Sequence, residues 1–453
     1  MANVTSAVKA AASSAPPQLY RKIAWRLFPL LMVTYTFAYL DRINIGFAKI
    51  HMAADIGLSE AMYGLGAGIF FLGYVMFEVP SNLLMQRIGA RKTFTRILIL
   101  WGCVSASMMF VTEPIHFYIL RFLLGVFEAG FAPGMILFVT LWFPRVRMGA
   151  VMAILMIPSP LGSMIGGPLS TGIIVWFDGF AGLAGWQWMF LVEGLPCLIL
   201  GVIVWRTLPN GPHEARWLSD EERFLIAKDL AADRKDDQGE KASFRKVLVN
   251  PRIYGLAVAY FAIISGLYTI SFWLPTIIKD NGVESILQIG LWAALPFAVS
   301  LIAMQWVARR SDRTGERRWH CLVPLSVGSA ALSVAALIPT PFAISIAALV
   351  VATAGLYCAY TVFWATSSAF LSGPAAAGGI AYINSIGLLG GFFSPTLIGY
   401  TKELTGTTSF GLLTIVAVLA VGGVALFLTR IRDASTTLGM TEDMATNVKR
   451  RSA

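Results

Sequence analysis

Long apolar stretches separated by short polar loops follow one another along most of the chain. Roughly 20 apolar residues let an α-helix cross the hydrocarbon core of a bilayer, and twelve stretches approach this length. The pattern therefore predicts an all-α membrane protein with twelve transmembrane helices. The expected spans are residues 25–47, 60–85, 95–112, 115–141, 148–176, 186–206, 252–276, 286–308, 319–338, 342–370, 376–400 and 409–430.

The overall composition supports the same class of protein. Of the 453 residues, 57% are hydrophobic and only 13% are charged, and the mean hydropathy is +0.69. A soluble protein of this size could not bury so much apolar surface in one core, so lipid must be its solvent. The four cysteines all lie within predicted spans, and no Cys or His spacing suits a metal. We expect no disulfide, no metal site and no cofactor.

Basic residues sort by loop, which predicts how the chain is oriented. They are concentrated in every second loop, and the alternate loops hold only Lys49, Lys279 and Lys402. Loops rich in Lys and Arg remain on the cytoplasmic side, so both termini should be cytoplasmic. Residues 1–20 contain no apolar stretch, so we expect no cleaved signal peptide. Because the net charge of +10 reflects this sorting, it does not indicate a nucleic-acid partner.

A polar segment divides the spans into six and six. We expect a cytoplasmic tail over residues 1–20, a bundle over 21–208, a cytoplasmic linker over 209–251, a second bundle over 252–431 and a tail over 432–453. Ser219 is an N-cap signal for a short amphipathic helix in the linker. The charge-rich stretch Asp229–Lys241 is expected to be mobile. A monomer suffices for this architecture.

One loop motif occurs twice, after span 2 and after span 8, which suggests a duplicated six-helix unit. Gln86–Lys92 reads QRIGARK and Asp312–Arg318 reads DRTGERR. A glycine turn flanked by cations can form a breakable clasp between helix ends on the cytoplasmic side. Alternatively, the cations only fix the topology. The candidate gating residues are Arg87, Gly89, Arg91, Asp312, Arg313, Gly315 and Arg317.

This doubled motif resembles the signature of the major facilitator superfamily, and further segments resemble its anion:cation symporter family. The likeness covers residues 20–430, and within that family the sequence is similar to the tartrate, phthalate, aromatic-acid and sugar-acid permeases. One departure is Gln86, which stands where the superfamily usually has Asp, so the first clasp should rely on other partners. The segments that carry the likeness are YLDRINIGFA (39–48), FFLGY (70–74), FEVPSN (77–82), RFLLGVFEAGF (121–131), WFP (142–144), GWQWMFLVEGLP (185–196) and NSIG (384–387).

Charged residues within the spans are the first candidates for function, because each costs about 2.5 to 3.5 kcal/mol at bilayer depth. They are Asp41, Arg42, Arg121, Glu128 and Glu193. Arg121 and Glu128 are two helical turns apart and lie on one face. Guanidinium groups bind carboxylates through two charge-assisted bonds, so Arg42 and Arg121 predict an acidic substrate. The alternative is that Asp41 pairs with Arg42, and Glu128 with Arg121, as purely structural bridges.

The buried acids have a possible second role in proton coupling. A carboxyl group away from water tends to keep its proton, and a nearby cation favours its ionised form. Substrate binding to an arginine could therefore change whether the acid is protonated. The resemblance implies that Asp41 and Glu128 are the proton-linked acids, Glu128 in connection with substrate binding and Asp41 in gating. We interpret Glu78 and Glu193 as structural.

Polar and aromatic side chains in other spans are candidates for binding the rest of the substrate. Tyr39 and Tyr74 offer hydroxyl groups, Trp364 an aromatic wall and Asn384 an amide. Ser159 lies between two prolines that free backbone carbonyl groups in span 5. Each could instead be a packing or interface residue, or mark a kink, and the resemblance favours Tyr74 and Asn384 for binding.

Together these features predict a secondary transporter in the inner membrane. We expect it to take up a small organic anion with protons by alternating access; the anion could be a tartrate-like hydroxy-dicarboxylate, a sugar acid or an aromatic carboxylate. Alternatives are a proton-driven antiporter that exports its substrate and a transporter-like substrate sensor. An enzyme is not expected, because no nucleophile with a base, metal site, ATP-binding loop or dinucleotide motif is found.

Overall fold

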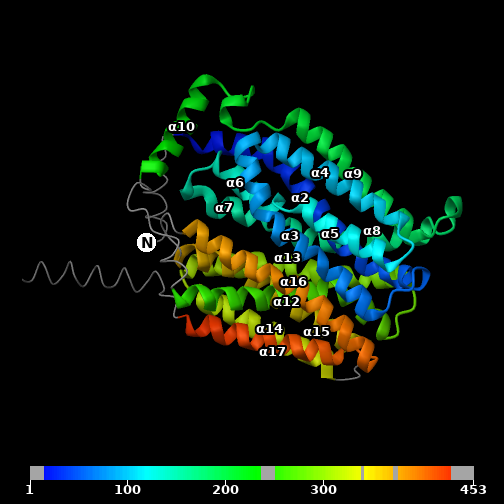
Figure 1. The fold of residues 1–453 in the computed structure, drawn as a ribbon. Coiled ribbons are helices and arrows are strands. Elements are labelled where there is room, and N and C mark those ends of the chain that lie inside the picture. Colours follow the sequence, from blue (N-terminus) through cyan, green and yellow to red (C-terminus); the bar gives the residue numbers. More distant parts are fainter. Residues whose placement is uncertain (1–14, 236–249, 338–340, 371–375, 430–453) are drawn as a thin grey trace, which may run out of the picture.

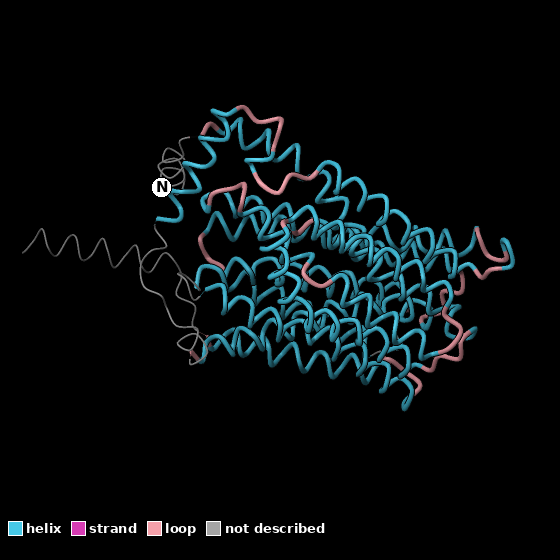
Figure 2. The backbone as a smooth tube through the Cα atoms, turned by 45° about the horizontal axis from the view of Figure 1, so that its top comes forward, coloured by secondary structure: helices cyan, strands magenta, loops and turns pink. Residues whose placement is uncertain are grey.

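The computed structural model describes residues 15–235, 250–337, 341–370 and 376–429. The predicted C-terminal tail and most of the N-terminal tail lie outside these residues, and so does the linker stretch 236–249. Within the described ranges the chain is helical and contains no strand. Figure 2 shows that the helices run roughly side by side and that most loops gather at the two ends.

Twelve helices in the described part of the chain are long and apolar enough to cross a membrane, as predicted. The first six spans are α2 (Pro17–Asp55), α3 (Glu60–Ile88), α4 (Ala90–Ser107) with η1 (Met108–Phe110), α5 (Pro114–Glu128) with α6 (Phe131–Thr140), α7 (Arg145–Leu155) with α8 (Pro158–Trp176), and α9 (Gly185–Thr207). The second six are α12 (Pro251–Asp280), α13 (Ile286–Thr314), α14 (Arg318–Leu337), α15 (Phe342–Phe370), α16 (Ala376–Thr405) and α17 (Ser409–Leu428).

The helices form two groups that lie against each other in Figure 1, α2 to α9 above and α12 to α17 below. Within the first group the closest neighbours include α4 with α9, and α3 with α5. Within the second they include α14 with α15, and α12 with α16. The two groups meet chiefly through α3 against α16, α8 against α13 and α2 against α12. The inner faces of these six helices therefore line much of any site between the groups.

Glycines allow the two groups to approach closely. A Cβ atom added at Gly399 would lie 2.4 Å from the Glu60 carbonyl oxygen, and one at Gly64 would lie 2.4 Å from the Pro395 carbonyl oxygen. Without side chains at these positions, the backbones of α3 and α16 pack almost directly together. Small residues therefore set the spacing between the two groups.

Two of the spans are broken at points close to the charged residues. Span 4 changes from α5 to α6 at Ala129 and Gly130, and Gly130 adopts a φ of 86°. Glu128 is the last residue of α5. Span 5 changes from α7 to α8 just before Pro158, which places Ser159 in the first turn of α8. Broken membrane helices expose backbone polar groups where a substrate or protein groups can satisfy them.

The linker begins with the short helix η3 (Pro212–Glu214) and continues as α10 (Asp220–Lys235). Ser219 caps α10 as predicted: its hydroxyl oxygen accepts from the Glu222 backbone N–H at 3.1 Å, and its own N–H donates to the Glu222 carboxylate at 2.9 Å. The expectation of a mobile stretch from Asp229 is wrong for its first part, because residues 229–235 continue the helix. Asp229 is buried there and accepts a hydrogen bond from the Tyr20 hydroxyl at 2.8 Å.

Candidate functional site

Arg42 on α2 lies between the two groups of helices. Its guanidinium donates to Glu128 at the end of α5 and, at 2.6 Å, to the hydroxyl of Tyr268 on α12. Its Nε is buried and has no hydrogen-bond partner among the described residues. Tyr39 and Phe70 each place a ring centroid 5.1 Å from the guanidinium carbon. The central cation thus has one charged partner, one hydroxyl partner and one unused donor.

Arg121 on α5 has a different environment. The side chain is only 1% exposed, and its hydrogen bonds go to the carbonyl oxygens of Gly66 and Ala67 on α3, both at 3.3 Å. It forms no ion pair with a carboxylate in the described part of the chain. Its guanidinium carbon lies 5.2 Å from the Phe70 centroid, against the ring that Arg42 also contacts. Two guanidinium groups therefore share one aromatic neighbour. Arg42 forms a direct ion pair, whereas Asp41 and Glu128 act on Arg121 only at longer range.

Asp41 points away from its neighbour Arg42 and into the first group of helices. It accepts hydrogen bonds from the Trp101 indole and the Ser105 hydroxyl of α4, and from the Asn44 amide at 3.2 Å. The proposed structural bridges of Asp41 with Arg42, and of Glu128 with Arg121, are therefore not formed. Instead Glu128 pairs with Arg42, and Asp41 is held by neutral donors. This pairing could not be read from sequence spacing.

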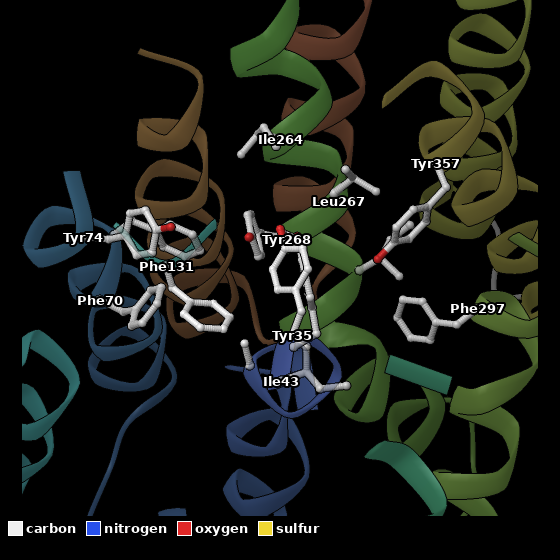
Figure 3. Close-up of a cluster of buried hydrophobic side chains, with 14 of the residues drawn as sticks. Tyr35, Ile43, Phe70, Tyr74, Phe131, Ile264, Leu267, Tyr268, Phe297 and Tyr357 are labelled. Atoms are coloured by element: carbon white, nitrogen blue, oxygen red, sulfur yellow. Dashed lines mark hydrogen bonds between the residues drawn. The ribbon is translucent and has the colours of Figure 1, made fainter. Parts of the chain in front are cut away.

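Aromatic side chains from both groups surround Arg42. Figure 3 shows Phe70 and Tyr74 of α3, Tyr35 of α2 and Tyr268 of α12 around the centre, and Tyr357 of α15 farther along the interface. The Tyr74 and Tyr268 centroids lie 5.7 Å and 6.0 Å from the Arg42 guanidinium carbon. Four rings, including those of Tyr39 and Phe70, thus contact this cation. Rings around a cation offer both apolar contact and hydroxyl groups to a bound molecule.

The other predicted binding residues make contacts around this centre. The Ser159 hydroxyl lies 3.3 Å from the Tyr357 hydroxyl, across the contact between the two groups. Trp364 donates from its indole to the Tyr260 hydroxyl at 3.3 Å. Asn384 donates to Glu78 at 2.7 Å, which joins α16 to α3. The structure thus brings Tyr39, Tyr74 and both arginines together. The immediate partners of Ser159, Trp364 and Asn384 are other residues.

The chain matches the model of the Major Facilitator Superfamily over residues 31–395. This match covers most of the chain. The protein belongs to the Major Facilitator Superfamily. Members of this superfamily are membrane transporters and not enzymes, so the chain is a multi-pass transporter of small molecules.

Several superfamily members resemble the chain over most of its length. It is 45% identical to NicT of Pseudomonas putida, named as a metabolite transport protein, over 86% of this chain and 89% of that one. It is also 45% identical to a protein of Agrobacterium vitis named as a tartrate transporter, over 90% of both chains. A quinolone resistance transporter of Acinetobacter baumannii is 41% identical over 86% of this chain and 90% of that one.

Solved structures of the superfamily have the same fold. A bacterial homologue of the human lysosomal transporter Spinster, in an inward-facing and occupied conformation, superposes with a TM-score of 0.73. That likeness covers 92% of this chain and 98% of the other at 16% identity. The XylE xylose transporter of E. coli, partially occluded and inward open, gives a TM-score of 0.68 at 13% identity, over 90% and 97% of the two chains. These similarities establish the superfamily fold.

The two superfamily loop motifs make different contacts. Arg91 in the first copy donates to Glu214 of the linker at 2.7 Å and to the Leu208 carbonyl at 2.6 Å. Arg317 in the second copy lies 3.7 Å from Asp312. Gly89 and Gly315 adopt positive φ angles of 86° and 69°, which glycine tolerates readily. The first copy of the motif therefore has a linker acid, Glu214, as an ionic partner, and its role in a clasp stays a prediction.

Two further cations of the loop motifs lie at helix ends. Arg87 and Arg313 lie in the last turns of α3 and α13, where the negative end of the helix dipole stabilises a cation. The pKa of Glu214 is below its ordinary value, because Asn210 donates to the carboxylate and Arg91 lies beside it. Glu214 therefore stays ionised, and able to hold Arg91, at neutral pH.

Sequence reasoning missed several residues of the site. Phe70 and Tyr268 contact Arg42, and Asn44 contacts Asp41. Phe70 and Tyr268 lie in apolar stretches without a charge to mark them. Asn44 could have been found, because a buried amide three residues from Asp41 lies on the same helical face. Tyr268 has no such signal, since its role depends on α12 packing against α2.

Sequence reasoning also missed an ionic cluster at the end of the helices opposite the N-terminal end of α2. Lys49 of α2 and Lys402 of α16 both pair with Glu60 of α3, and Lys402 also lies 2.8 Å from Asp280 of α12. The Lys49 ammonium lies 4.2 Å from the Trp273 centroid. Since α2 and α3 belong to one group and α12 and α16 to the other, this cluster joins the two groups. We call these residues the far-end ionic cluster.

Proposed function

We propose that this transporter takes up a small organic anion together with protons across the inner membrane. The substrate class consists of carboxylates of the size of tartrate, a sugar acid or an aromatic acid. The proposal rests on one observation above all: Arg121 is a fully buried cation whose hydrogen bonds go only to backbone carbonyls. Asp41 and Glu128 act on this cation only from beyond ion-pair distance. A buried charge without a carboxylate in direct contact is costly, and a bound carboxylate would offset that cost.

Arg42 supplies the second half of the binding site in this proposal. Its bond to Glu128 occupies one edge of the guanidinium, and its Nε stays unused. An incoming carboxylate would compete with Glu128 for Arg42. Once displaced, the Glu128 carboxyl group would lose its cation in a low-dielectric environment and would bind a proton. Substrate binding and proton binding would then favour each other, as symport of the two in the same direction requires.

The tyrosines and the aromatic ring between the arginines would hold the remainder of the substrate. Tyr39, Tyr74 and Tyr268 offer hydroxyl groups suited to a hydroxy acid, and Phe70 offers a flat apolar face. Ser159, Trp364 and Asn384 would contact the substrate only after they exchange their present partners. These residues would set selectivity, whereas the two arginines select for negative charge.

Alternating access would follow from rocking of the two helix groups. The far-end ionic cluster and the α3 to α16 contact would close the outer side in this conformation. Opening to the outside would break these ion pairs. The loop clasps around Arg91 and Arg317, on the proposed cytoplasmic side, would form and break in the opposite phase.

Uptake by the purified protein in proteoliposomes tests the proposal. Radiolabelled tartrate, galactonate, phthalate and hydroxybenzoate are offered with and without an imposed proton gradient, acidic outside. We expect accumulation of at least one of these acids, and a marked increase with the gradient. Uptake at the same rate with and without the gradient would contradict proton symport. The absence of uptake or exchange with any of these acids would contradict transport of an organic anion.

Export by proton antiport is a second candidate, favoured by the similarity to a protein named as a quinolone resistance transporter. The same vesicles separate the two functions. An antiporter would drive a fluoroquinolone in the direction opposite to the proton flow, and tartrate or galactonate would not compete with it. A symporter would move the acid in the same direction as the protons. The symporter is favoured by Arg121, whose hydrogen bonds go to backbone carbonyls and not to a carboxylate of the described residues.

A further inference from the structure

Glu193 on α9 is a buried carboxyl group that the proposed cycle above does not use. The side chain is 1% exposed. One carboxyl oxygen accepts from the Ser170 hydroxyl of α8 at 2.7 Å, and the other accepts from the Asn44 amide of α2 at 2.9 Å. Three helices thus converge on this group. The contacts fix its position, but both donors are neutral.

No cation pairs with Glu193 within the described residues. Its helix packs against α2, α4, α8 and η1. The titratable groups that face it from these elements and from α9 itself are Asp41 and Cys197, and neither is cationic. A carboxylate in such surroundings would be an uncompensated buried charge, which is among the most unfavourable states a side chain can adopt. The neutral, protonated form fits the site much better.

Asn44 joins Glu193 to Asp41. Its amide nitrogen donates to Asp41 at 3.2 Å and to Glu193 at 2.9 Å, so one NH₂ group serves two carboxyl groups. The amide oxygen is buried and has no partner among the described residues. Two carboxylates held this close would repel each other if both were ionised. When interacting acids share a site, their protons are bound by the pair and not by independent groups.

The two acids have unequal support. Asp41 accepts hydrogen bonds from the Trp101 indole and the Ser105 hydroxyl in addition to Asn44, and the positive charge of Arg121 also acts on it. Among the described residues, Glu193 accepts side-chain hydrogen bonds only from Ser170 and Asn44. In this conformation the charge is therefore better placed on Asp41 and the proton on Glu193. A change at either acid alters the balance of the other.

We propose that Glu193 is a proton-binding residue of the transport cycle, paired with Asp41 through Asn44, so that the two carboxyl groups bind and release protons as one unit. This inference rests on the proposed proton-coupled function. It assigns to Glu193 a role beyond holding helices together, because a purely structural carboxyl group would keep the same proton throughout the cycle.

The test compares Glu193→Gln with the unchanged protein in proteoliposomes. Proton movement is followed with a pH-sensitive dye while substrate movement is followed with the radiolabelled acid that the wild type transports best. We expect Glu193→Gln to move fewer protons per substrate molecule. We also expect the pH profile of gradient-driven uptake to shift to lower pH, because Asp41 loses a neighbour whose negative charge would help it retain a proton. Glu193→Asp should restore the proton count.

A gentler variant guards against misfolding of Glu193→Gln. Ser170→Ala removes one hydrogen-bond donor from the Glu193 carboxyl group and leaves the acid in place. The ionised form loses a stabilising contact, so the pH profile should move to higher pH, opposite to the first variant. Ser300→Ala is the matched control, since Ser300 is equally buried and bonds only to the Pro296 carbonyl of its own helix.

The outcomes separate this inference from the proposed function. Wild-type uptake that ignores the proton gradient would overturn both. Coupled wild-type uptake with an unchanged proton count and pH profile in Glu193→Gln would overturn the role of Glu193 alone. If Glu193→Gln yields no folded protein, an unchanged pH profile in Ser170→Ala would likewise overturn it.

Discussion

Arg121 and Arg42 show how two identical side chains take different roles from their surroundings. Arg42 is neutralised by Glu128, whereas the hydrogen bonds of Arg121 go to two backbone carbonyls. Carbonyl oxygens orient a guanidinium group without cancelling its charge. The arrangement orients the Arg121 cation in a position where no carboxylate of the described residues is bonded to it.

The first prediction concerns Arg121. Replacement by Gln keeps some hydrogen bonding to the α3 carbonyls but removes the charge. We expect substrate affinity to fall by roughly 100-fold or more, the order expected when a buried charge partner is lost. Substrate binding to the detergent-solubilised protein measures this. Arg26→Gln, at an exposed position of α2, is the matched control. Comparable affinity in Arg121→Gln and the control would exclude Arg121 from the binding site.

Glu128 provides the second prediction at this scale. Glu128→Gln retains the shape of the side chain and its ability to contact Arg42, but it cannot exchange a proton. We expect substrate exchange between the two sides to persist while accumulation driven by a proton gradient is lost. Counterflow and gradient-driven uptake are measured on the same vesicles, with Glu113→Gln, an exposed acid just before α5, as control. Normal accumulation by the glutamine variant contradicts the coupling role.

At the scale of elements, the interruptions in spans 4 and 5 place Glu128 and Ser159 at helix ends. Residues at a break can shift without bending a whole helix, because the backbone there is not held by a continuous hydrogen-bond ladder.

The far-end ionic cluster acts between elements in another way. It joins α2 and α3 to α12 and α16 by ion pairs whose lysines are buried and whose acids, Glu60 and Asp280, stay partly exposed to solvent, so water can replace these contacts when they break.

The third prediction tests the far-end ionic cluster. Lys402→Gln removes the cation that lies between Glu60 and Asp280, so the conformation closed at this end should lose stability relative to one open there. A cysteine placed at the buried position Thr276 reports the change through its rate of labelling by a membrane-impermeant maleimide. We expect faster labelling in the Lys402→Gln background, by roughly fivefold for about 1 kcal/mol.

Two comparisons complete this labelling experiment. The chain without the added cysteine gives the background from Cys103, which is exposed, whereas Cys197, Cys321 and Cys358 are buried. Lys92→Gln, in the first turn of α4 near the other end of the helices, controls for loss of a positive charge. Equal labelling with and without Lys402 would mean that the ionic cluster does not hold this end closed.

At the scale of the whole molecule, the described residues contain twelve helices that could cross a membrane, and an even number of crossings would place the two termini on the same side. The distribution of Lys and Arg over the loops predicts that this side is the cytoplasm. The far-end ionic cluster would then face outward, and the conformation described here would be closed to the outside.

The fourth prediction follows from this orientation. Epitope tags at the N- and C-termini should be protected from protease in intact spheroplasts and cleaved in inverted membrane vesicles. A tag inserted between α2 and α3, for example after Gly57, should show the opposite pattern. Cleavage of either terminal tag in intact spheroplasts would reverse the orientation and with it the direction assigned to the closed end.

The sequence by itself determined the number and position of the spans, since a bilayer imposes one length and one polarity on every crossing segment. It also identified the charged residues in the spans, because burial in lipid makes each of them conspicuous. Linker helix α10 was predictable from the cap at Ser219, whereas its continuation through Asp229 was not. A sequence window cannot reveal that a distant tyrosine buries this acid.

Only the tertiary structure decided which charges meet. Adjacent residues Asp41 and Arg42 point to different partners, because successive side chains on a helix are separated by about 100°. Glu128 pairs with Arg42 on another helix, and Glu193 meets Asn44 from far along the chain. Such pairings depend on how helices pack and rotate against each other. Local hydropathy fixes that a helix crosses the membrane, but its neighbours decide which of its faces become a site.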